Sequence, residues 1–169
     1  MSGVSDIDAG SDLLALLATD HARIQRILDE GADLETLQRE IEPHLVSEDQ
    51  LLYRELRRNF AEADPFIDDL LDLDRRLEEA LAVSDEIGPA EMATIAQLFA
   101  EHVRRQEDEA FPKLRSRVSE ERLVLLGGAL MEVMRTAPTR PHPHSPDEGW
   151  REQLADGYHA IVDHLFHRH

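Results

Sequence analysis

The chain has 169 residues, the size of one domain, and its 36 acidic residues outnumber its 18 basic residues. The resulting net charge of −18 makes nucleic acid and anionic membranes unfavourable partners. The absence of cysteine excludes disulfides, zinc–thiolate sites and cysteine-bound iron–sulfur clusters. The first residues do not resemble a signal peptide and no apolar run approaches about 20 residues, so we expect a soluble cytoplasmic protein. A monomer or a homodimer is expected.

Apolar residues recur at helical spacing through most of the chain, and no stretch alternates like a strand. The spacing predicts four long helices, at about 12–30, 34–60, 65–83 and 90–115. Ser11 or Asp12 is expected to cap the first helix and Asp33 the second, which Pro43 is expected to kink. Four long helices joined by short connections favour an all-α, up-down-up-down four-helix bundle.

The remainder of the chain adds helices outside this bundle. Ser119 opens a shorter helix that is weakened by Gly127 and Gly128. A proline- and histidine-rich connector follows, and an amphipathic C-terminal helix ends the chain. The expected organisation is therefore a flexible N-terminus at 1–10, a bundle with a short fifth helix at 11–136, and the connector with the last helix at 137–169.

Two stretches carry a histidine and a carboxylate at spacings suited to metal binding. His44 and Glu48 are four residues apart, so both leave one face of a helix. His102 and Glu107 are five apart, a wider step that still leaves both on roughly one side. His21 lies on or beside the buried stripe of the first helix. A single histidine on an apolar stripe is usually a hydrogen-bonded core residue, but three on three helices, two of them with carboxylates at ligand spacing, favour an ion held inside the bundle.

The third helix has no histidine and is instead rich in carboxylates. Asp74 and Glu78 are four residues apart beside its apolar stripe, so either one is a candidate ligand. The competing interpretation is a solvated acidic face, which is the usual role of such residues.

Taken together, these pieces resemble the hemerythrin-like HHE cation-binding family over roughly residues 13–146. The matching segments are DHARI at 20–24, His44-x3-Glu48, and His102-x4-Glu107 leading into FPKL at 111–114. The segment APTRPHP at 137–143 also resembles one that follows the domain in many bacterial members. Each piece is weak alone, and their common order and separations make the resemblance specific.

The resemblance implies a non-haem di-iron centre inside a hemerythrin-like four-helix bundle. By this resemblance His21, His44 and His102 are terminal iron ligands, and Glu48 and Glu107 bridge the irons. The family's third-helix histidines fall on Asp74 and, where a second is present, on Glu78. Iron is the expected cofactor, with manganese or zinc as alternatives, and the small-molecule partner is O2, peroxide or NO.

The missing third-helix histidine changes the expected chemistry. A carboxylate in place of imidazole stabilises ferric over ferrous iron, which disfavours reversible oxygen carriage. An altered centre is then favoured, either carboxylate-rich, mixed-metal or with one metal only. Redox or gas sensing, oxidase or peroxidase activity, and iron handling are not distinguished by the sequence.

Two other hypotheses remain open at this stage. In the first hypothesis, the bundle holds no metal and acts as a protein-interaction module. The Leu/Met-rich helix at 123–134 would then cover a partner. In the second, surface histidines near the C-terminus bind zinc, nickel or copper. These are His142, His144, His159, His164, His167 and His169.

Overall fold

The computed structural model describes residues 11–82, 87–136 and 149–166, and every regular element in these ranges is a helix. The predicted all-α class is confirmed for this part of the chain. The helices are α1 (Leu13–Asp29), α2 (Leu34–Ser47), α3 (Arg54–Asn59), α4 (Asp64–Leu81), α5 (Pro89–Arg105), α6 (Phe111–Arg115), α7 (Glu120–Thr136) and α8 (Gly149–Phe166). None of these described helices has the length and apolar character needed to cross a bilayer.

Local sequence signals explain where the first helices begin and end. The Asp12 carboxylate accepts a hydrogen bond from the Ala15 backbone N–H at 2.8 Å, and Asp33 caps α2 in the same way. Each cap satisfies one of the backbone donors that have no partner inside the helix. Gly31, with a φ of 74°, allows the chain to turn in the left-handed region after α1.

The second and fourth predicted helices are each interrupted by a π-helical turn. The stretch at 34–60 is α2, then the π-turn η1 (Glu48–Tyr53), then α3. The stretch at 90–115 is α5, then the π-turn η3 (Gln106–Ala110), then α6. α2 runs on through Pro43, so the irregularity follows His44 instead of preceding it. Such turns contain one extra residue and are frequent at functional sites.

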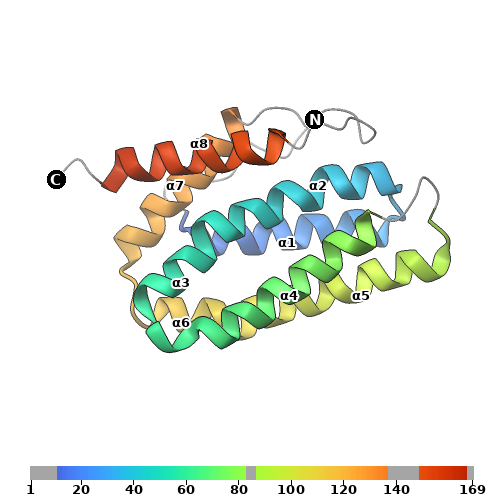
Figure 1. Ribbon diagram of the computed structural model, residues 1–169, viewed down its shortest axis with the longest axis horizontal. Coiled ribbons are helices and arrows are strands. Elements are labelled where there is room, and N and C mark those ends of the chain that lie inside the picture. Colours follow the sequence, from blue (N-terminus) through green and yellow to red (C-terminus); the bar gives the residue numbers. More distant parts are fainter. Residues whose placement is uncertain (1–10, 83–86, 137–148, 167–169) are drawn as a thin grey trace.

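The helices α1 to α6 run lengthwise beside one another, while α7 and α8 cover one side of them (Figure 1). Along the helices the interior divides into two apolar clusters. One contains Leu17, Leu51, Leu70 and Ala110, and the other contains Ile24, Leu45, Leu77 and Phe99. The helix positions between these clusters hold buried polar groups.

The helix α7 extends the first cluster by packing against α1. Its Leu123, Leu126 and Leu130 are buried there. At Gly127 a side-chain β-carbon would overlap the Ser11 carbonyl oxygen, whereas Gly128 has open space around it. Gly127 is therefore needed for the close approach of α7 to the start of α1.

Candidate metal centre

Three histidines from three helices meet in the layer between the two apolar clusters. His21 is on α1, His44 on α2 and His102 on α5, and their ring centroids lie 4.8 to 5.7 Å apart. Each imidazole is at most 2% exposed. Glu48, the first residue of η1, is fully buried among them. One potential ligand atom from each of the four residues lies within 4.8 Å of every other.

The Glu48 carboxylate is the centre of this cluster. Its Oε1 lies 2.7 Å from His44 Nε2 and 3.1 Å from His21 Nε2, and its Oε2 lies 3.1 Å from His102 Nε2. All three imidazoles therefore present the same ring nitrogen to one carboxylate. Glu48 reaches this point because it is four residues after His44, one helical turn further along the same face.

The opposite ring nitrogens, the three Nδ1 atoms, each contact a different carboxylate. His44 Nδ1 is 2.7 Å from Asp20 and His102 Nδ1 is 2.7 Å from Asp74. His21 Nδ1 is 2.9 Å from Glu107. An Nδ1–H that donates to such a carboxylate leaves the Nε2 lone pair free to bind a metal, and this carboxylate–histidine arrangement is common around protein metal ions.

Several buried atoms in the cluster have no hydrogen-bond partner. They are Nε2 of His44, which faces Oε1 of Glu48, and Nε2 of His102 and Oε2 of Glu48, which face each other; neither contact has the alignment of a hydrogen bond. Buried polar groups are normally paired, and lone pairs at this separation repel unless a positive charge lies between them. Either protons or a metal cation must supply that charge.

The electrostatics of the cluster show how strongly a positive charge is favoured there. Burial lowers the pKa of His44, but the Glu48 and Asp20 carboxylates outweigh it and raise the pKa to about 9. Burial likewise lowers the pKa of His102, and Glu48 and Asp74 together raise it to about 10. Burial raises the pKa of Glu48, yet His102 and His44 hold it well below its usual range.

Bonds beyond Asp74 tie the two π-turns together. The Tyr53 hydroxyl, at the end of η1, donates to Asp74 at 2.7 Å, and Gln106 Nε2, at the start of η3, donates to the Tyr53 oxygen at 2.9 Å. Burial, followed by the nearby Asp74 and Glu48 charges, raises the pKa of Tyr53 well above its usual range. This chain of bonds keeps the Asp74 carboxylate directed at His102.

Aromatic rings form part of the wall that separates the cluster from water. Phe111 stacks on His21 with an interplanar angle of 8°, and Phe99 stacks on His102 at 22°. Phe99 is fully buried and Phe111 is 7% exposed. A cation in this cluster would therefore lie in a setting of low dielectric, where its interactions with the ligand atoms are strengthened.

The six ligands predicted from the sequence occupy two distinct positions. His21, His44, Glu48 and His102 form the inner group. Asp74 and Glu107 bind the outer, Nδ1 side of His102 and His21. Asp74 is 6% exposed, so the alternative of a solvated face is wrong for this residue. Its role as a metal ligand, and that of Glu107, stay predictions.

Other candidate residues lie away from the inner group. Glu78, on α4, lines a cavity of about 390 Å³ that also reaches Asp74. His159 is exposed and its Nδ1 lies 3.1 Å from Arg54 Nη1, while His164 is exposed near the end of α8. The remaining tail candidates, His142, His144, His167 and His169, lie outside the described residues.

Sequence reasoning missed three residues that support the inner group, namely Asp20, Tyr53 and Gln106. Each is directly adjacent to a predicted motif or lies within it, and none has a distinctive spacing of its own. Asp20 precedes His21 in the chain but contacts His44 on another helix. Only the packing of α1 against α2 brings this pair together.

Comparison with protein-family models, curated protein sequences and solved structures returned no match to this chain. The geometry of the cluster is therefore the basis for proposing a function.

Proposed function

We propose that this protein is a hemerythrin-like, metal-binding four-helix bundle that holds non-haem iron in the His/Glu cluster. The protein ligands are Nε2 of His21, His44 and His102 together with the Glu48 carboxylate. Imidazole and carboxylate are donors suited to iron, and also to manganese and zinc. When bound, iron with an open coordination position supplies redox chemistry toward O2, peroxide or NO.

One observation carries this proposal: three buried Nε2 atoms face a single buried carboxylate, and two of the three are without a hydrogen bond. Ligands on opposite sides of a transition-metal ion lie about 4.2 Å apart, twice a typical metal–nitrogen distance. The four atoms here lie within 4.8 Å of one another, so a small contraction suits them to one ion.

The residues around the inner group have separable tasks in this proposal. Asp20, Asp74 and Glu107 accept hydrogen bonds from Nδ1 and so fix the orientation and tautomer of the imidazoles. Phe99 and Phe111 restrict water on two sides. At neutral pH the metal ion takes the place of the protons favoured on His44 and His102.

The arrangement favours one ion over two. A second ion would need further ligands, and the carboxylates on the outer side of the imidazoles are Asp20, Glu107 and Asp74. Asp20 already uses one oxygen for Arg23 and the other for His44, which leaves Glu107 and Asp74. Asp74 already uses one oxygen for His102 and the other for Tyr53. Glu107 is the freer of the two because its side chain is 38% exposed. The di-iron form implied by the family resemblance is therefore the second candidate, with Glu107 as its added bridge.

The metal-free interaction module receives less support. Two features favoured it, the missing third-helix histidine and the Leu/Met-rich helix at 123–134, yet Leu123, Leu126 and Leu130 of α7 are buried in the protein's own core. Without a metal, moreover, the cluster keeps its charge balance only by holding protons on buried imidazoles.

Metal analysis of tag-free protein, combined with proton release, tests the proposal. One equivalent of Fe(II) or Mn(II) should bind per chain and release about two protons near pH 7, one each from His44 and His102. His102→Ala should abolish both signals, whereas the control His164→Ala, in the exposed tail, should leave them unchanged. Two equivalents would select the di-iron form, and binding that persists in His102→Ala would reject the inner group as the site.

A further inference from the structure

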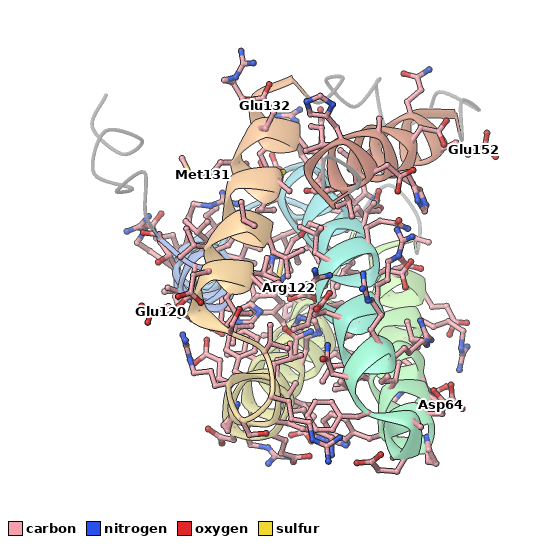
Figure 2. The ribbon with its side chains drawn as sticks, turned by 90° about the vertical axis from the view of Figure 1, so that its left-hand side faces the viewer. Asp64, Glu120, Arg122, Met131, Glu132 and Glu152 are labelled. Atoms are coloured by element: carbon pink, nitrogen blue, oxygen red, sulfur yellow. The ribbon has the colours of Figure 1, made fainter. Side chains whose placement is uncertain are left out.

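A cavity of about 400 Å³ opens beside the His/Glu cluster, between α1, α2 and α7. This volume is in the range of pockets that hold small organic molecules. Its apolar part is formed by Leu16, Leu17, Leu130, Met131 and Met134. Met131 and Met134 are 37% and 45% exposed, so they lie at the opening, and Met131 lies on the edge of α7 opposite α8 in Figure 2.

The other end of the cavity is polar and touches the candidate metal centre. Asp20, His44 and Ser47 line this end, and Arg23 and Glu40 form an ion pair on its wall. His44 is one of the four inner residues, so an occupant of the cavity lies against the back of a proposed ligand. The cavity thus combines apolar and polar walls.

The hydrogen bonds available at the polar end determine which head group a bound amphipathic molecule can have. A carboxylate offers about four acceptor positions. Oδ1 of Asp20 receives two N–H groups of Arg23, and Oδ2 faces His44 Nδ1, which leaves one position on Oδ2. Ser47 Oγ donates its own hydrogen to the His44 carbonyl, so it too can only accept. Arg23 uses three of its five N–H groups on Asp20 and Glu40, so a head group that both donates and accepts hydrogen bonds fits this end best.

The charged side chains at this end narrow the choice of head group further. An anionic head cannot donate, so it would leave the free acceptor positions on Asp20 and Ser47 unpaired. A cationic head is disfavoured because Asp20 is already compensated by Arg23, at 2.7 Å. A neutral hydroxyl can donate to Asp20 and still accept.

We propose that this cavity binds a neutral aliphatic alcohol or alkylphenol, with its hydroxyl group against Asp20 and its chain between Leu17, Leu130 and the two methionines. The site lies beside the proposed metal and does not require it. Binding energy comes from burial of the apolar chain, and selectivity comes from the Asp20 acceptor. When the centre holds metal, the hydroxyl end is the end of the ligand nearest to it.

Matched ligands test the head group on the wild-type protein, with metal removed by a chelator. n-Octanol, its isomer heptyl methyl ether, and octanoate have nearly the same chain, and only the alcohol is a neutral donor. Ligand-detected NMR should show n-octanol binding about fivefold or more tighter than the ether, because the ether leaves an acceptor unpaired. Octanoate should bind more weakly still. Equal affinity for alcohol and ether, or no binding of the alcohol, would overturn the proposal.

Two substitutions on the same helix test the location. Met134→Glu places a charge at the mouth and should weaken n-octanol binding about fivefold. Leu125→Glu is the matched control, since Leu125 is 44% exposed on α7 but does not line the cavity; its affinity should stay within about twofold of wild type. Equal losses of n-octanol affinity in both variants would contradict the assignment of the binding site to this cavity. If Met134→Glu does not fold, the ligand series above still decides the matter.

A measurement on Mn(II)-loaded protein separates this inference from the proposed function. Paramagnetic relaxation of bound n-octanol should be strongest at the hydroxyl end and decline toward the methyl end. Binding with head-group selectivity in protein that takes up neither Fe(II) nor Mn(II) would support the cavity and refute the metal centre. A methyl end relaxed more strongly than the hydroxyl end would overturn the assigned orientation.

Discussion

The two histidine–carboxylate motifs look alike in the sequence and behave differently in the structure. After His44, Glu48 is fully buried, and its two oxygens face three imidazole Nε2 atoms. After His102, Glu107 is 38% exposed and contacts His21 from the outside through Nδ1. Both carboxylates lie in π-turns, so the π-turn alone does not decide their roles. The difference teaches that a motif supplies a carboxylate near a histidine, while the neighbouring helices decide which side of the imidazole it faces.

The largest expected difference between the two carboxylates is in metal binding and stability. Glu48→Gln should lower Mn(II) affinity by more than about 100-fold and destabilise the metal-free fold by about 3–5 kcal/mol, because buried histidinium charges lose their counter-charge. Glu107→Gln should lower metal affinity only about 10-fold, as expected for an outer hydrogen-bond partner. Calorimetric titration and chemical denaturation measure these effects.

Equal losses of metal affinity in the two variants would contradict the distinction between an inner Glu48 and an outer Glu107. They would favour a shared, bridging role for both carboxylates. That result would return the di-iron form to first place.

The pH dependence of stability should also separate the two residues. His44 and His102 have folded pKa values of about 9 and about 10, above an unfolded value of about 6.5. Their stabilising effect on the metal-free protein is therefore complete below about pH 6.5 and is lost as the pH rises through 9 to 10. Between pH 6.5 and 9 each histidine should lower the free energy of unfolding by about 1.4 kcal/mol per pH unit.

Glu48→Gln should flatten this slope, because the Glu48 charge is the main reason that both histidine pKa values are raised. Glu107→Gln should keep it. Urea denaturation of the chelator-treated proteins at several pH values provides the measurement, and an unchanged slope in Glu48→Gln would contradict the described electrostatics.

Substitutions of Asp74 test whether this carboxylate orients His102 through Nδ1 or binds the metal itself. If Asp74 orients His102, then Asp74→Asn keeps an oxygen for Nδ1–H and should lower metal affinity less than Asp74→Ala, for which we expect about 10- to 100-fold. A ligand role predicts similar losses for both substitutions. Under the di-iron hypothesis, Asp74→His should in addition move the optical spectrum of the iron-loaded protein toward that of histidine-rich di-iron centres.

The smallest effect concerns the link between the two π-turns. Tyr53 ends η1 and accepts a hydrogen bond from Gln106, which begins η3. A double-mutant cycle with Tyr53→Phe and Gln106→Leu should give a coupling energy of about 1 kcal/mol in denaturation experiments. A coupling near zero would mean that the turns are held independently by their own helices.

The sequence by itself determined the helices and most of the inner group. Apolar spacing, with Asp12 and Asp33 as caps, marked the helices to within a few residues, because these signals act between neighbours in the chain. Local spacing also puts His44 and Glu48 on one helix face, whereas the full set with His21 and His102 was predicted from the family resemblance, since a single histidine beside an apolar stripe is usually a hydrogen-bonded core residue.

Only the tertiary structure decided which nitrogen of each imidazole faces inward and which carboxylate lies behind it. Asp20 with His44 and Asp74 with His102 are contacts between different helices, and no local pattern specifies such pairs. The same holds for the cavity between α1, α2 and α7, which exists because α7 packs on α1 at Gly127. Helical periodicity shows which face is buried, whereas the partner of that face depends on how the helices pack.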